Sequence, residues 1–71
     1  MKKFNINVKE NNKYILCYFY DDIINISGYC YQDIALREYY YFRDKGCLCS
    51  INTITNKISV DRIISSFVER L

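Results

Sequence analysis

The sequence predicts an α+β fold: about five antiparallel strands, forming a small twisted sheet or an SH3-like or Sm-like barrel, with a C-terminal amphipathic helix packed on it. Three observations support this prediction. Apolar and polar residues alternate near the N-terminus, aromatic and β-branched residues dominate the middle of the chain, and the last twelve residues carry an apolar stripe with helical spacing. A chain of 71 residues can bury one core and not two, so we expect a single domain over residues 1–71.

The first two expected strands cover residues 3–9 and 14–20. In the first, Phe4, Ile6 and Val8 alternate with Lys and Asn, which is typical of a strand with one buried face. The polar residues 10–13 include two Asn, which tolerate tight turns, and predict a hairpin. Residues 14–20 are apolar or aromatic throughout, so this strand is expected in the middle of the sheet.

The third strand is expected at residues 23–31, after a turn at Asp21-Asp22. Ile24, Ile26 and Cys30 fall on one face by alternation. Gly28 interrupts this segment, and a glycine inside a strand predicts a bulge or a sharp bend.

Two further strands are expected at residues 38–42 and 47–53, joined by a turn at 43–46. The first is rich in Tyr, which favours strands, although a helical turn at residues 32–37 is the alternative. The second alternates and places Cys47, Cys49 and Ile51 on one face.

The clearest element is the C-terminal helix. Ser59 is the expected N-cap, and Asp61 in the first turn is favoured by the helix dipole. An isolated helix of this length is marginal in water, so its apolar stripe should be buried on the sheet or on a partner. The stripe consists of Val60, Ile63, Ile64, Phe67, Val68 and Leu71.

Composition excludes the common catalytic and cofactor sites, so we expect no enzyme activity and no cofactor. The chain has no His, which removes the usual general base, and two glycines cannot form a phosphate-binding loop. Four Cys without an export signal indicate reduced, core-forming thiols, with a zinc site as the alternative. Asp21-Asp22 with Asp33 or Asp44 is the alternative cation site, but Asp at these positions is typical of turns.

The net charge of +2 is spread along the chain and gives no basic block that would wrap a phosphate backbone. The start of the chain, Met-Lys-Lys-Phe-Asn-Ile-Asn, is neither a signal peptide nor a membrane span. We therefore expect a cytoplasmic protein that does not act at a membrane.

From Gly28 onward the chain resembles the WYL-type domains, small Sm-like or SH3-like barrels of bacterial regulators and defence proteins. The matching segments are Ser27-Gly28-Tyr29-Cys30, the run from Arg37 to Arg43, and Thr55-Asn56-Lys57-Ile58. The chain departs from that family in having no Trp and in carrying Phe42 where an acidic residue is usual. The resemblance implies a five-stranded barrel that binds nucleotides or single-stranded nucleic acid through Arg37 and Arg43.

Tyr and Arg are enriched at the energetic centres of protein interfaces, and Tyr rings also stack on bases. The alternative is that the Tyr rings of this chain only fill the core of the sheet and its rim. AT-rich coding would also raise the Tyr content. The expected binding residues are Tyr29, Tyr31, Arg37, Tyr39, Tyr40, Tyr41 and Arg43.

Two functions fit these features. The first is a small protein-binding inhibitor or modulator of the phage or mobile-element type, acting on a host defence nuclease or a similar nucleic-acid-processing complex. The second is a nucleotide or single-stranded nucleic-acid binder. A homodimer joined by a sheet edge or by the helix stripe is compatible with both.

Overall fold

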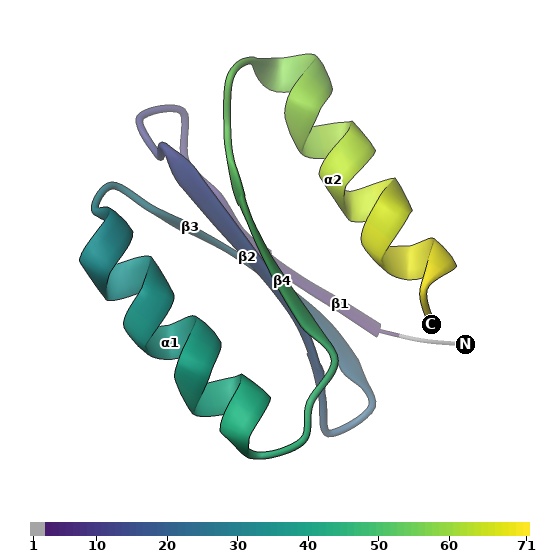
Figure 1. Cartoon of the computed structure of the whole chain (residues 1–71). Helices are drawn as coiled ribbons and strands as arrows, with labels where there is room; N and C mark the ends of the chain where they lie inside the picture. The colour runs from purple at the N-terminus through teal and green to yellow at the C-terminus, as the bar shows by residue number, and fades with distance from the viewer. Residues whose placement is uncertain (1–2) are drawn as a thin grey trace.

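The computed structural model describes residues 3–71, with Lys57 and Ile58 described by their backbone alone. The α+β prediction is confirmed (Figure 1). Two parts of our predictions lie outside the described residues. These are the start of the chain, Met1 and Lys2, which we used against an export signal, and the side chains of Lys57 and Ile58. The elements follow the order β1 (Lys3–Asn7), β2 (Tyr14–Tyr20), β3 (Ile23–Tyr29), α1 (Gln32–Asp44), β4 (Cys49–Thr53) and α2 (Lys57–Glu69).

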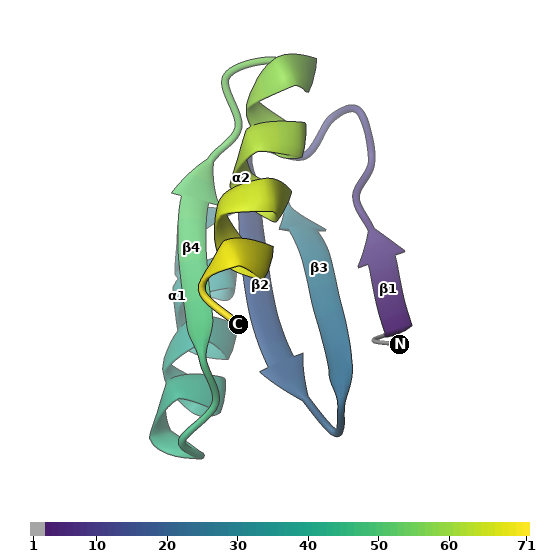
Figure 2. The same cartoon turned by 90° about the vertical axis from the view of Figure 1, so that its right-hand side faces the viewer.

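The four strands form one open sheet in the order β1-β3-β2-β4. Helix α1 lies on one face of the sheet and α2 on the other, so the molecule has three layers (Figure 1). Both helices lie over the β2–β4 side, and β1 stands uncovered at the far edge (Figure 2). The described chain thus has four strands in a mixed open sheet, and the predicted five antiparallel strands and barrel are not confirmed.

The predicted hairpin between the first two strands is wrong. Strand β1 pairs in parallel with β3, with Phe4 opposite Ile24 and Ile6 opposite Ile26. The chain must therefore cross the end of β3 to reach β2. The carboxamide oxygen of Asn12 accepts a hydrogen bond from the Lys9 N–H at 2.7 Å, which holds the crossing loop in place.

Gly28 allows this crossing. It stays in register opposite Ile15, so β3 has no bulge there, in contrast to our expectation. A Cβ at Gly28 would lie 2.7 Å from Cγ of Asn12, closer than van der Waals contact permits. The Asn12 side chain thus occupies the space that a side chain at residue 28 would need.

The turn at Asp21-Asp22 is confirmed as the hairpin between β2 and β3. Both residues have positive φ angles, 55° and 62°. This backbone is that of a two-residue hairpin turn, in which Asp is tolerated better than most side chains. The position of β2 inside the sheet, between β3 and β4, is also confirmed.

The predicted fourth strand at residues 38–42 is wrong, because this segment belongs to helix α1. The buried Ala35 and the half-buried Tyr39 and Phe42 recur every three or four residues, which is helical spacing. Packing of this stripe on the sheet overrides the strand propensity of the Tyr run. The last strand, β4, consequently pairs with β2 and not with a preceding hairpin partner.

The main core lies between the sheet and α2. Ile15, Cys17, Ile24, Ile26 and Phe67 are buried together there. The predicted packing of the terminal helix on the sheet is confirmed, although the helix begins before its stripe and ends at Glu69, so that Leu71 of the predicted stripe lies beyond it.

The N-cap of α2 is Asn56, whose side chain accepts a hydrogen bond from the backbone N–H of Ser59 at 2.9 Å. Ser59, our expected cap, lies inside the first turn.

Candidate functional site

The aromatic side chains gather on the outer side of α1 and the neighbouring end of β2. Tyr20, Tyr40 and Tyr41 are exposed by 47%, 46% and 53%. The guanidinium of Arg43 lies over Tyr40, and the amine of Lys45 lies near Tyr20 and Tyr41. We call these five residues the α1 aromatic surface.

Phe42 and Tyr18 support this surface from below. Their rings are stacked, with centroids 3.9 Å apart and an interplanar angle of 14°. Phe42 also contacts Tyr20 at 5.9 Å and the edge of Tyr41 at 5.1 Å. Because Phe42 contacts both Tyr20 and Tyr41, these two exposed rings are held by packing and lose little conformational freedom on binding.

Each cation lies over a ring. The guanidinium of Arg43 is 4.7 Å from the ring centre of Tyr40, and Nζ of Lys45 is 4.7 Å from that of Tyr41. A hydrogen bond to Tyr41 raises the pKa of Lys45. Cation–π contacts of this kind hold long side chains in defined positions at a protein surface.

Five of the seven predicted binding residues lie on α1, where the sequence predicted a strand with the segment before it and a turn after it. Arg37, Tyr40, Tyr41 and Arg43 are exposed, and Tyr39 is half-buried. The edge of Tyr39 meets Tyr40, with ring centres 5.3 Å apart. Helical spacing therefore brings together the residues at the C-terminal end of α1.

The other two predicted residues lie away from this surface. Tyr31 is the N-cap residue of α1 and is 66% exposed. Tyr29 ends β3 and is half-buried, and burial together with the nearby Glu38 carboxylate raises the pKa of its phenol. Tyr31 and Tyr41 are ten residues apart, about 15 Å along a helix. Tyr29 pairs with Tyr14, at the opposite end of β2 from Tyr20, so neither Tyr29 nor Tyr31 joins the α1 aromatic surface.

Three residues of this region were missed by sequence reasoning: Tyr20, Phe42 and Lys45. Tyr20 ends a strand whose residues were all apolar or aromatic, so nothing in its own segment distinguished it. The Ala35–Tyr39–Phe42 spacing was the available signal, because it predicts a helix that faces the sheet with Phe42 and presents Tyr40 and Tyr41 outward.

A shallow hollow of about 370 Å³ adjoins the surface between α1 and the β2–β3 turn. Its walls include Tyr18, Tyr20, Tyr41, Phe42 and Lys45. Asp21 also lines it. An apolar or aromatic side chain of a partner would meet ring faces here and a cation at the edge.

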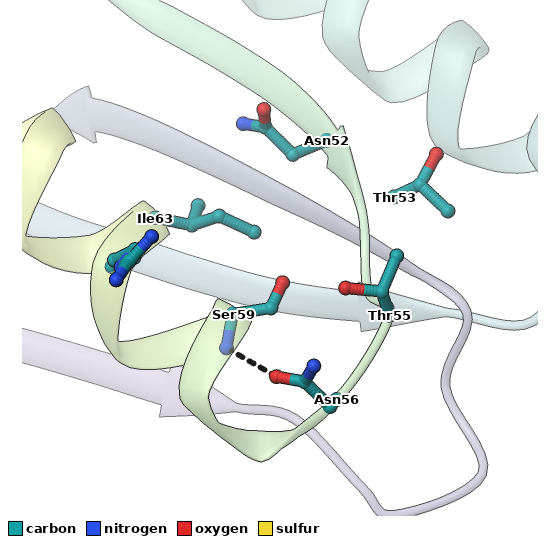
Figure 3. A pocket seen from close by; sticks show the side chains of 7 residues that line it. Asn52, Thr53, Thr55, Asn56, Ser59 and Ile63 are labelled. Atoms are coloured by element: carbon teal, nitrogen blue, oxygen red, sulfur yellow. Dashed lines mark hydrogen bonds between the residues drawn. The ribbon is translucent and has the colours of Figure 1, made fainter.

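A second hollow of about 500 Å³ lies between the end of β4 and the first turns of α2 (Figure 3). Polar side chains surround it, among them Asn52, Thr55 and Arg62. Its lining includes no carboxylate, thiol or amine that could act as a general acid or base, and Asn56 there already caps the helix. The hollow thus offers mainly hydrogen-bonding groups.

Over the described residues, no three Cys, Asp, Glu or His side chains come close enough to hold a metal ion. Cys17 is fully buried, and burial raises the pKa of its thiol to about 11. Cys49 is buried too, and its thiol donates to the carbonyl oxygen of Tyr39 at 3.8 Å. Both thiols pack as core side chains.

Neither helix in the described part of the chain has the length and hydrophobicity needed to span a bilayer.

Comparison of the chain with models of known protein families, with curated proteins and with solved structures gave no match.

Proposed function

We propose that this chain is a non-enzymatic binding protein that occupies a surface of a larger protein through the α1 aromatic surface. The observation that supports this proposal most directly is the set of three half-exposed Tyr rings with Arg43 and Lys45 on their faces. Tyr and Arg are the residue types that dominate binding energy at protein interfaces. Tyr20 and Tyr41 pack on Phe42, and rings fixed by packing bind without a large entropy cost.

The charge of the region favours a protein partner over a nucleic-acid backbone. Helix α1 carries Arg37 and Arg43, but also Asp33, Glu38 and Asp44. Mixed charge around an aromatic centre is the pattern of a protein interface with a polar rim, whereas a phosphate backbone is bound by an excess of cations.

The size and composition of the chain suggest the biological setting. We propose a cytoplasmic modulator of the phage or mobile-element type, which blocks a host defence nuclease or a related nucleic-acid-processing complex by covering part of it. A small chain acting in this way needs an interface and no catalytic residue.

The alternative function is binding of a nucleotide or of single-stranded nucleic acid. It draws support from the ring faces of Tyr40 and Tyr41 and from the WYL-type resemblance, which assigns ligand contacts to Arg37 and Arg43. The two arginines lie on a helix in this structure and not on the strand that the resemblance implies.

Affinity capture from host lysate, with and without nuclease treatment, distinguishes the two functions. The wild-type chain is compared with the double variant Tyr40→Ala/Tyr41→Ala and with Tyr31→Ala, a matched removal of an exposed ring outside the surface. We expect a protein that survives nuclease treatment, is retained by Tyr31→Ala and is lost from the double variant.

Removal of two ring contacts should weaken binding of the purified partner by about 100-fold. Recovery of nucleic acid alone, or equal capture by all three chains, would contradict the proposal. Steep weakening of binding with salt would indicate the nucleic-acid alternative.

A further inference from the structure

The α2 side of the sheet carries an apolar area that neither helix covers. Strand β1 is an edge strand, and its side chains Phe4 and Ile6 point to the α2 side together with Ile24 and Ile26. They are 50% and 57% exposed, because α2 lies over β2 and β4 (Figure 2). We call Phe4 and Ile6 the β1 floor.

The opposite side of β1 can be compared with this apolar side, because both sides of the strand are exposed. There β1 is also uncovered, but its side chains are Lys3, Asn5 and Asn7. The Asn5 side chain donates to the carboxamide oxygen of Asn25 at 3.3 Å. The side of β1 that faces away from α2 is thus polar, and the side that faces α2 is apolar.

The flank of α2 continues the β1 floor as a wall. Ile64 and Val60 line a hollow of about 730 Å³ together with Ile6 and Val8. Val68 follows Ile64 by four residues, which places it on the same side of α2. Leu71 lies just beyond the end of the helix, where its backbone N–H donates to the Val68 carbonyl oxygen at 3.1 Å. Val68 and Leu71 are 36% and 37% exposed, so floor and wall form one L-shaped apolar surface.

We infer that this L-shaped surface binds a second copy of the chain, with the two β1 floors packed face to face around a two-fold axis. Stacked sheets lie about 10 Å apart, and a helix with its side chains is about 10–12 Å across. The β1 edge of one copy therefore fits beside α2 of the other, where Val68 and Leu71 meet it. A two-fold arrangement makes both contacts at once.

The exposed apolar area supplies a substantial part of what such a dimer needs. A large apolar side chain carries on the order of 150–200 Å² of accessible surface. The exposed fractions of Phe4, Ile6, Val68 and Leu71 then amount to roughly 600 Å² over two copies. A standard interface buries about 1,600 Å², somewhat over half of it apolar, so these four side chains alone supply about two thirds of the apolar part.

The charges are compatible with self-association. The floor and wall carry no charged side chain, so two copies of net charge +2 place no like charges inside the contact. Lys9, Glu10 and Asp61 stand around the hollow and provide a rim of both signs. An apolar centre with a mixed polar rim is typical of protein interfaces.

Sedimentation equilibrium over a dilution series tests the inference on the full chain. We expect the wild type to behave as a dimer and Ile6→Glu to raise the dissociation constant by about 100-fold or more, because it buries a charge in an apolar contact. Asn7→Glu is the matched control, with the same charge on the neighbouring residue of the same strand but on its other side, and it should remain dimeric. Far-UV circular dichroism verifies that each variant is folded.

Two further variants make the result specific to this geometry. An equimolar mixture of Ile6→Glu and Ile6→Lys should recover a heterodimer, since the two floors then bring opposite charges together. Val68→Glu should also dissociate the dimer, whereas a dimer joined only through paired β1 edges would survive it. A wild type that stays monomeric up to its solubility limit, an Ile6→Glu dimer, or a dimer that persists in Val68→Glu would each overturn the inference.

Discussion

The ring of Phe42 on α1 stacks on the ring of Tyr18 on β2 at 3.9 Å, and this contact joins the helix to the sheet. Phe42 also supports the α1 aromatic surface from below, since its ring contacts Tyr20 and Tyr41 as well. Stability and the proposed binding surface therefore depend on the same ring.

Phe42→Ala should lower the free energy of unfolding by about 2 kcal/mol, less than for a fully buried Phe because this ring is half-buried. Phe42→Leu retains part of the apolar contact and should cost less than half as much. Urea unfolding followed by circular dichroism measures both. Equal stability of all three chains would contradict the role of the stack.

Gly28→Ala should destabilise the chain by about 1–3 kcal/mol, because the new methyl group meets Asn12. The Asn12 side chain cannot move freely, since it accepts from the Lys9 N–H and donates to Sγ of Cys30 at 3.6 Å.

In the Asn12→Gly background the same Gly28→Ala change should cost less, and a double-mutant cycle measures this coupling. Additive effects would show that Gly28 serves another purpose than making room for the crossing loop.

Asn56→Ala should cost about 1 kcal/mol of stability, because it removes the side-chain acceptor at the start of α2. Asn56→Asp keeps an acceptor and should be close to the wild type. Ser59→Ala is the decisive control, since Ser59 was the cap expected from the sequence, and it should change stability by less than about 0.5 kcal/mol. Thermal unfolding measures the three variants. A larger loss of stability in Ser59→Ala than in Asn56→Ala would show that Ser59 is the cap.

Cys17 should make stability fall at alkaline pH. Burial raises the pKa of its thiol in the folded chain from 9.0 to about 11. A raised folded-state pKa contributes stability that is complete below pH 9.0 and is lost as the pH rises toward 11. The loss should be on the order of 2 kcal/mol.

Tyr18 and Tyr29 also have raised pKa values through burial and Glu38, so the measurement compares the wild type with Cys17→Ala. Urea unfolding at the two ends of this pH range should show a smaller decline for the variant. Parallel declines would show that the thiol does not contribute.

Several elements could be predicted from the sequence because their patterns are local. Alternation in residues 3–7, the unbroken apolar run of β2 and the stripe of α2 are each set by side chains on one face of one element. The Asp21-Asp22 turn was readable for the same reason, as turn chemistry depends on the residues in the turn itself.

Only the tertiary structure decided the rest. In residues 38–42 the strand propensity of the Tyr run competes with the helical spacing of Ala35, Tyr39 and Phe42, and packing on the sheet, including the stack of Phe42 on Tyr18, favours the helix. The pairing of β1 with β3 likewise depends on Asn12 fitting over Gly28, sixteen residues apart in the chain.

The candidate site follows the same division. The sequence determined that Tyr and Arg would be concentrated between residues 37 and 43, and the fold decided which of them reach solvent. Helical spacing turned Tyr40, Tyr41 and Arg43 outward and Phe42 inward, and the β2–β3 hairpin added Tyr20 from a distant segment. Composition is a property of the chain, whereas a surface is made by packing between elements that local patterns do not connect.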